Sequence, residues 1–138
     1  IQKEALQQTE KRLQASGVIE RVCLKLEGHE NVEKYLKQEV KAAIFNLGFL
    51  PGSDKTIITK AETTIVAVEA LMTHLCFGGR IILVVYYGHH GGMSEKDALL
   101  KFARNISQER FNVLQYQFIN QVNSPPFVLV LEKKEVKK

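Results

Sequence analysis

Cysteine is scarce in this chain, with only Cys23 and Cys76 among 138 residues. The two stand far apart in apolar surroundings, and the spacing of cysteines and histidines that is typical of a zinc site is absent. We therefore expect two buried free thiols, as is usual in a cytoplasmic protein, and no metal site.

Long apolar runs are missing as well. No stretch approaches the roughly 20 apolar residues of a membrane-spanning helix, so no membrane partner is expected. The first residues also lack the basic and then apolar pattern of a signal peptide. Ile1 is not methionine, and the sequence opens as if already inside a helix. We therefore expect that the chain has been processed or cut, or that its start was not recorded.

The composition is that of a folded domain. Hydrophobic residues make up 45% of the chain and charged residues 25%, which is enough apolar surface for the core of one domain over residues 1–138. The net charge is +4 and the sequence pI about 9.1. This surplus is compatible with a nucleic-acid partner, although part of it lies in the tail 132–138, where charged side chains are usually solvated.

Hydrophobic periodicity alternates between the helix and the strand pattern along the chain. Helices are predicted over residues 2–16, 29–40, 59–79 and 94–106, and strands over 21–28, 80–88, 111–120 and 127–134. Segment 41–54 is predicted to be a compact apolar strand that breaks into a loop rich in glycine and proline. Gly17 and the pair Gly78 and Gly79 are predicted to end helices, and Ser94 to cap one.

This order predicts an α/β sheet with mainly parallel strands and helices on both faces. A short turn over residues 123–126, with the sequence NSPP, joins the last two strands. The turn predicts a hairpin, so one strand of that pair should run antiparallel to the rest.

Three predicted strand ends carry unusual residues, and they should meet at one edge of the sheet, where ligands of such sheets bind. The segments are EGHEN at 27–31, NLGFLPG at 46–52 and YYGHHGG at 86–92. Glycines there allow close approach to a ligand, but they also mark ordinary loops. The adjacent His89 and His90 point in different directions on an extended loop, so a shared metal ion is not expected. Nucleophile-elbow, phosphate-loop and dinucleotide-binding motifs are all absent.

Taken together, NLGFLPG, YYGHHGG and FINQVNSPP resemble a family of small bacterial methyltransferases that was long labelled rRNA methylases. The resemblance covers the chain from Ile1 to about Lys134. It implies a Rossmann-like class I methyltransferase sheet with a C-terminal antiparallel hairpin strand. It also implies S-adenosylmethionine as cofactor and, as substrate, the amino group of 5-aminomethyl-2-thiouridine at the tRNA wobble position, in the anticodon loop.

The resemblance also assigns roles to residues. Gln2 matches the glutamine that follows the family's ribose-binding aspartate, and the segment GHEN should lie against the adenine. Asn46 would accept a hydrogen bond from the target amine and aim its lone pair at the methyl group. The residues implied to bind the cofactor are Gln2, Gly28, His29, Asn46, Leu47 and Gly48.

The loop at 86–92 is implied to cover the substrate, stacking aromatic and imidazole rings on a flipped-out base. His89 is the second catalytic candidate, because a histidine can take a proton from the substrate ammonium. Phe49 stands where many relatives have tyrosine. The residues implied to bind the substrate are Phe49, Pro51, Tyr86, His89, His90 and Gly91.

The sequence departs from the family at its N-terminal end. The family's first strand and its glycine-rich loop, with the helix and strand that follow, have no counterpart here. We expect an N-terminally incomplete methyltransferase, whose sheet lacks two strands between segments 21–26 and 42–46. The alternatives are an rRNA methyltransferase of the same fold and a non-catalytic RNA-binding remnant. The faces of segments 111–117 and 127–131 are compatible with a homodimer or with a covered sheet edge.

Overall fold

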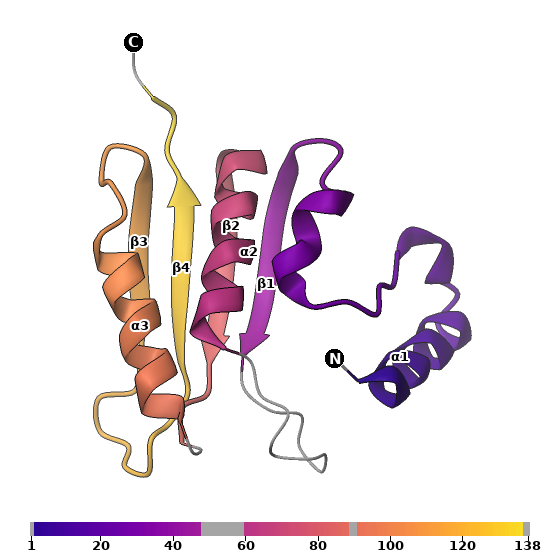
Figure 1. Ribbon diagram of the computed structural model, residues 1–138, viewed down its shortest axis with the longest axis horizontal. Helices are drawn as coiled ribbons and strands as arrows, with labels where there is room; N and C mark the ends of the chain where they lie inside the picture. The colour runs from indigo at the N-terminus through magenta and orange to yellow at the C-terminus, as the bar shows by residue number, and fades with distance from the viewer. Residues whose placement is uncertain (1, 48–59, 89–90, 137–138) are drawn as a thin grey trace.

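Four strands form one mixed sheet in the computed structural model, which describes residues 2–47, 60–88 and 91–136. The order across the sheet is β1-β2-β4-β3, as Figure 1 shows. β1 runs parallel to β2, while β4 runs antiparallel to both β2 and β3. The predicted antiparallel strand in the C-terminal hairpin is therefore confirmed, and it is β4. The strands are β1 Val40–Leu47, β2 Leu75–Val85, β3 Phe111–Tyr116 and β4 Phe127–Lys133.

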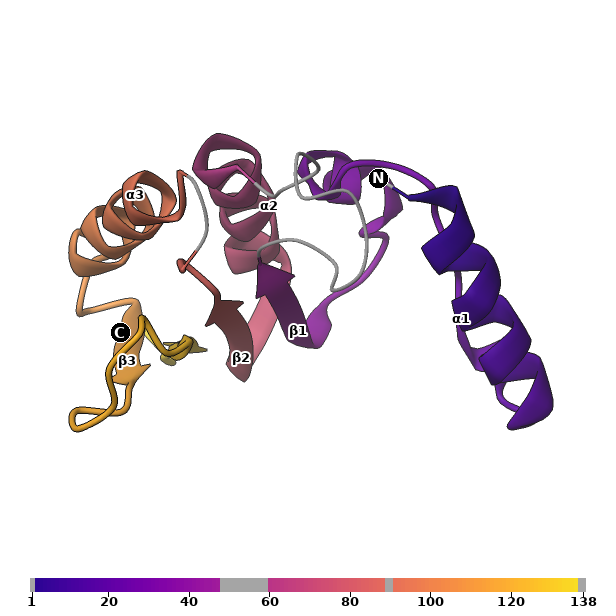
Figure 2. The same cartoon turned by 90° about the horizontal axis from the view of Figure 1, so that it is seen from below.

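The helices do not surround the sheet. α2 and α3 lie over the same face, whereas α1 lies apart from the sheet and packs against η1 (Figure 2). The prediction of helices on both faces is thus wrong for the described residues. None of the described helices has the length and apolar character needed to cross a membrane. The helices are α1 Lys3–Ala15, η1 Ile19–Arg21, η2 His29–Tyr35, α2 Ala61–His74 and α3 Gly92–Arg104, of which η1 and η2 are 3₁₀ helices.

The core lies between the sheet and α2 and α3. Because side chains alternate between the faces of a strand, every second residue of β2 and β4 points into it. Ile81, Leu83 and Leu131 are buried from the sheet side, and Val68 and Leu99 from the helices. Each such side chain contributes about 1.5–3 kcal/mol of burial free energy. The stability of the sheet therefore depends mainly on its helix-covered face.

The opposite face of the sheet carries a row of apolar side chains. The strand register places Ile44, Ile82, Val130 and Leu114 side by side across all four strands. No described helix covers them, and Ile44 is 72% exposed. We call this row and its neighbours the bare face.

Several predicted boundaries are wrong. Residues 21–26 form no strand in the described chain. Both cysteines are free as predicted, but neither is buried, since Cys23 is exposed and Cys76 half-buried. α2 ends at His74 and β2 begins at once, so the glycine pair lies inside an irregular part of the β1–β2 pairing. The cap of α3 is Gly91 in the left-handed conformation, not Ser94. Residues 21–26 lack a neighbouring described strand to pair with, and at α2 and α3 strand pairing or a tight turn overrides local sequence preference.

Candidate functional site

The candidate site lies at the carboxyl ends of β1 and β2. Asn46 and Leu47 end β1, and because they alternate, Leu47 is buried in the core while Asn46 is exposed on the bare face. Asn46 lies beside Val84 of β2 in the strand register. The exposed Asn46 amide group can therefore meet a ligand at the carboxyl edge of the sheet, while Leu47 anchors the strand end beneath it.

His29 anchors the loop before η2 to the start of α2. Its Nε2 lies 3.2 Å from the hydroxyl oxygens of both Thr63 and Thr64. Thr63 also donates its hydroxyl proton to the Lys60 carbonyl oxygen at 3.1 Å, which ties it to the start of α2. The His29 ring also meets the Phe45 ring edge-on, with 5.6 Å between centroids.

The His29 ring is neutral at physiological pH. Partial burial lowers the pKa of the imidazole below its ordinary value of 6.5, and the nearby Glu30 carboxylate opposes only part of this shift. Since its Nε2 is engaged by two threonine side chains, His29 acts on the site mainly by fixing the position of the 27–29 loop.

A hollow of about 530 Å³ lies between residues 23–35 and the free edge of β1. It brings together four of the predicted cofactor residues, Gly28, His29, Asn46 and Leu47. Apolar side chains such as Phe45 line much of the rest. The hollow thus occupies the place between segment 21–26 and β1 where the sequence predicts a gap in the sheet.

Glu27 also lines this hollow, and the sequence interpretation did not include it among the site residues. Its carboxylate accepts a hydrogen bond from the Tyr35 hydroxyl, and Lys34 Nζ lies 3.6 Å away. The Tyr35 hydrogen bond, followed by Lys34, lowers the pKa of the Glu27 carboxyl. Glu27 therefore presents a fixed negative charge at the hollow. Its position directly before Gly28 is the sequence signal that could have indicated it.

The loop after β2 starts at the same edge. Tyr86 is exposed, and its backbone amide bonds to the β1 end. A Cβ placed on Gly88 would lie 3.5 Å from the Ser124 Cβ, so the β3–β4 connection reaches this edge too. The motif FINQVNSPP includes this connection, but its sequence did not indicate that the connection lies beside the site.

Two glycines of this loop have structural roles. Gly91 has φ of +79° and caps α3. At Gly92 an added Cβ would lie 2.3 Å from the Tyr87 carbonyl oxygen, so only glycine fits there without rearrangement. The glycines after the two histidines are therefore explained by the turn into α3. A contact of Gly91 with substrate stays a prediction.

One described cofactor candidate is not brought to the hollow. Gln2 precedes α1 and does not line it. Among the residues that the structure describes, no group of three or more histidine, cysteine, aspartate or glutamate side chains could hold a metal ion. The predicted residues that lie outside the described ranges are Gly48, Phe49, Pro51, His89 and His90.

Comparison with known proteins shows a consistent family. Residues 1–132 match the family model described as "Putative rRNA methylase". A curated relative from Arabidopsis thaliana, named tRNA (mnm(5)s(2)U34)-methyltransferase, chloroplastic, is 35% identical over 138 residues. The match covers 96% of this chain and 50% of the relative, so the chain spans about half the length of that protein.

Solved structures agree with the family match. A putative rRNA methylase from Clostridium thermocellum superposes with a TM-score of 0.94 at 44% identity, covering 96% of this chain and 72% of the other. A putative methyltransferase from Streptococcus mutans, solved in complex with SAH, gives 0.89 at 41% identity over the same shares. A SAM-dependent O-methyltransferase from Thermotoga maritima shares the fold at 14% identity, with a TM-score of 0.61. The predicted Rossmann-like class I methyltransferase fold is confirmed.

Proposed function

Since this chain belongs to the family described as "Putative rRNA methylase", we propose that it forms the catalytic edge of an S-adenosylmethionine-dependent RNA methyltransferase. The observation that carries the proposal is the hollow that joins Gly28, His29, Asn46 and Leu47 at the end of β1. A ligand at that edge contacts the ends of parallel strands, which is the usual binding position in open α/β sheets.

The hollow fits the nucleoside part of the cofactor. Its apolar lining, with Phe45 and Leu71, suits a flat base, and the ionised Glu27 supplies acceptor oxygens. His29 holds the Gly28 backbone in place through its threonine contacts. When bound, S-adenosylmethionine supplies a methyl group on a positively charged sulfur. The described residues thus provide an apolar pocket for a nucleobase and a negative charge for such a molecule.

Asn46 is the residue proposed to position the nucleophile. Its side chain is exposed at the strand end, and its amide oxygen accepts hydrogen bonds only. By accepting a hydrogen bond from an N–H of the target amine, it directs the nitrogen lone pair toward the methyl group. The amine must be neutral to react, so the ammonium form has to lose a proton first. His89 is proposed for that step, and positioning accounts for most of the catalysis.

For the substrate, we propose 5-aminomethyl-(2-thio)uridine at the wobble position of tRNA. The name of the Arabidopsis relative, 35% identical to this chain, supports this substrate. The exposed Tyr86 at the site edge is the kind of side chain on which an unstacked base packs. Phe49, Pro51, His90 and Gly91 are proposed to complete the surface that contacts the anticodon loop.

The test is methyl transfer by the protein as it is encoded. Purified protein is incubated with S-adenosylmethionine and with tRNA carrying the unmethylated aminomethyl group, and the digested nucleosides are analysed by mass spectrometry. Gain of one methyl group on the wobble uridine supports the proposal. Methylation of ribosomal RNA alone would assign the protein to the rRNA alternative. RNA binding without methyl transfer or cofactor binding would identify a non-catalytic RNA-binding protein.

A further inference from the structure

Exposed apolar side chains gather in one stretch of the chain, residues 113–122. Fifteen large hydrophobic residues are exposed in the described parts of the molecule, and six of them fall within these ten positions. Ile119 is 91% exposed and Val122 79%. Such a concentration on a folded protein marks an interaction surface. The six residues, which we call the β3 patch, are Val113, Leu114, Tyr116, Phe118, Ile119 and Val122.

The β3 patch lies in an uncharged segment. From Phe111 to Leu131 the sequence contains no acidic, basic or histidine residue, although 25% of the whole chain is charged. A surface for RNA depends on lysine and arginine to neutralise phosphates, and this segment offers none. A twofold axis between two copies pairs the patch with itself. Because the segment is uncharged, this pairing brings no like charges together. The chemistry of the patch therefore favours a copy of this chain over RNA.

The backbone of β3 offers a matching edge. β3 is the outermost strand and pairs only with β4 among the described strands (Figure 1). Its register with β4 is regular from Phe111 to Tyr116, with no bulge. Edge strands are usually protected by charged side chains, prolines or bulges, and β3 has none of these. Its outer amide and carbonyl groups are therefore suited to pair with another strand.

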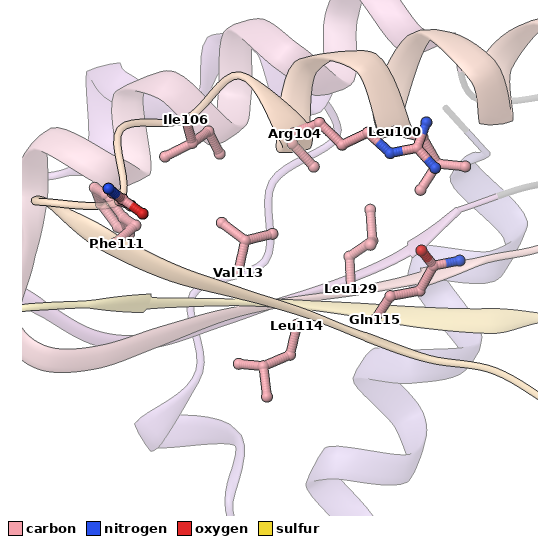
Figure 3. Close-up of a pocket in the computed structure, with 10 residues that line it drawn as sticks. Leu100, Arg104, Ile106, Phe111, Val113, Leu114, Gln115 and Leu129 are labelled. Carbon is pink, nitrogen blue, oxygen red and sulfur yellow. The ribbon is translucent and has the colours of Figure 1, made fainter.

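A groove of about 270 Å³ runs along this edge between α3 and β3. In Figure 3, Val113 and Leu129 point from the sheet toward the helix side, where Leu100 and Ile106 lie, whereas Leu114 points to the opposite face. Apolar side chains thus flank the β3 edge on both faces of the sheet. A strand added at this edge would find apolar contacts above and below it.

We propose that two copies of this chain associate through antiparallel pairing of their β3 edges, which buries the β3 patch of each copy. The loop that carries Phe118, Ile119 and Val122 also carries Ser124, which lies against Gly88 at the site edge. The pairing therefore fixes the β3–β4 connection beside the candidate site in both copies. This inference is independent of the reaction that the site performs.

The test is the molar mass of the protein as it is encoded, measured by light scattering at micromolar concentration. Wild type is expected at twice the mass of one chain. The double variant Leu114→Lys/Ile119→Lys places lysines in the β3 patch of both copies and is expected at the mass of one chain, with an unchanged circular dichroism spectrum. The control Val66→Lys, at an exposed position of α2, is expected to stay dimeric. A monomeric wild type, or a double variant that stays dimeric, would overturn the proposal.

A second measurement does not depend on the variants. Hydrogen exchange of the β3 amides in wild type should slow as protein concentration rises, because pairing protects them. Exchange that is independent of concentration would contradict the pairing. If wild type is monomeric and the double variant loses affinity for tRNA, the β3 patch binds RNA, and the proposal of a second copy is wrong.

Discussion

The carbonyl oxygen of Leu47 accepts a hydrogen bond from the backbone amide of Tyr86, with 3.3 Å between nitrogen and oxygen. The bond continues the pairing of β1 and β2 by one step beyond the end of the sheet. It holds Tyr86, the first residue of the loop after β2, against Leu47, the last residue of β1. Asn46 and Tyr86 are thereby kept at one edge, which is a requirement for any reaction that uses both.

Replacing Asn46 with alanine is expected to lower the rate of methyl transfer about 100-fold, because the amine would no longer be oriented. Cofactor affinity, measured by calorimetry, should change far less than the rate. The control is Asn112→Ala, which removes an exposed amide from β3. An Asn46 variant with wild-type turnover would remove this residue from the proposed mechanism.

Replacing His29 with alanine is expected to cost about 1 kcal/mol of stability at neutral pH, because its hydrogen bonds to Thr63 and Thr64 are lost. The variant should also change the pH dependence of unfolding. The folded state lowers the pKa of His29, so the unfolded chain binds its proton more readily. Wild type should therefore lose stability as pH falls through 6.5 toward the lower folded pKa, and be unaffected by this group above that range.

Urea denaturation of wild type and the His29→Ala variant between neutral and mildly acidic pH measures this effect. The stability difference between them should shrink as pH falls. His74→Ala is the matched control: His74 Nδ1 lies 2.9 Å from the Ala70 carbonyl oxygen of its own helix, so this variant removes an imidazole and leaves the contacts of His29 with Thr63 and Thr64 in place. A constant difference across the range would contradict the desolvated state of His29.

Replacing Gly92 with alanine is expected to destabilise the protein by about 1–3 kcal/mol, because the added Cβ meets the Tyr87 backbone at the turn into α3. Gly88→Ala is the control in the same loop, where the nearest atom would be at an ordinary 3.5 Å. Thermal unfolding followed by circular dichroism compares the two. Equal melting temperatures would show that the close approach at Gly92 is not required.

Two isoleucines on neighbouring strands test which face of the sheet is buried. Ile81 is fully buried under the helices, and Ile81→Ala should cost about 2–5 kcal/mol in urea unfolding. Ile44 lies on the bare face, and Ile44→Ala should change stability by less than about 0.5 kcal/mol. A large loss at Ile44 in the protein as it is encoded would mean that something covers the bare face.

Periodicity was sufficient to predict most of the elements and the reversed last strand. Segments 80–88 and 127–134 are long, apolar and rich in β-branched residues, and they became β2 and β4. Prediction failed at 21–28, where apolar residues alternate as in a strand but find no neighbour to pair with in the described chain. A strand is defined by its partners, and the residues of one segment do not contain that information.

The candidate site was predictable only in part from the sequence. The family resemblance implied Gly28, His29, Asn46 and Leu47 as cofactor residues, and the fold brings them to one hollow. The role of His29 in fixing its loop was not predictable, because it depends on threonines more than thirty positions away. Glu27 was missed because its contacts with Tyr35 and Lys34, which hold the carboxylate at the hollow, form only in three dimensions.

The position of β4 has a consequence for how the protein folds. β4 lies between β2 and β3 but follows both of them in the sequence, so neither of these strands can join the other before β4 is available. Until then, the uncharged β3 segment has no sheet to enter, and it remains an exposed apolar strand in the nascent chain. Closure of the sheet must therefore be a late and non-local event, during which self-association competes with correct folding.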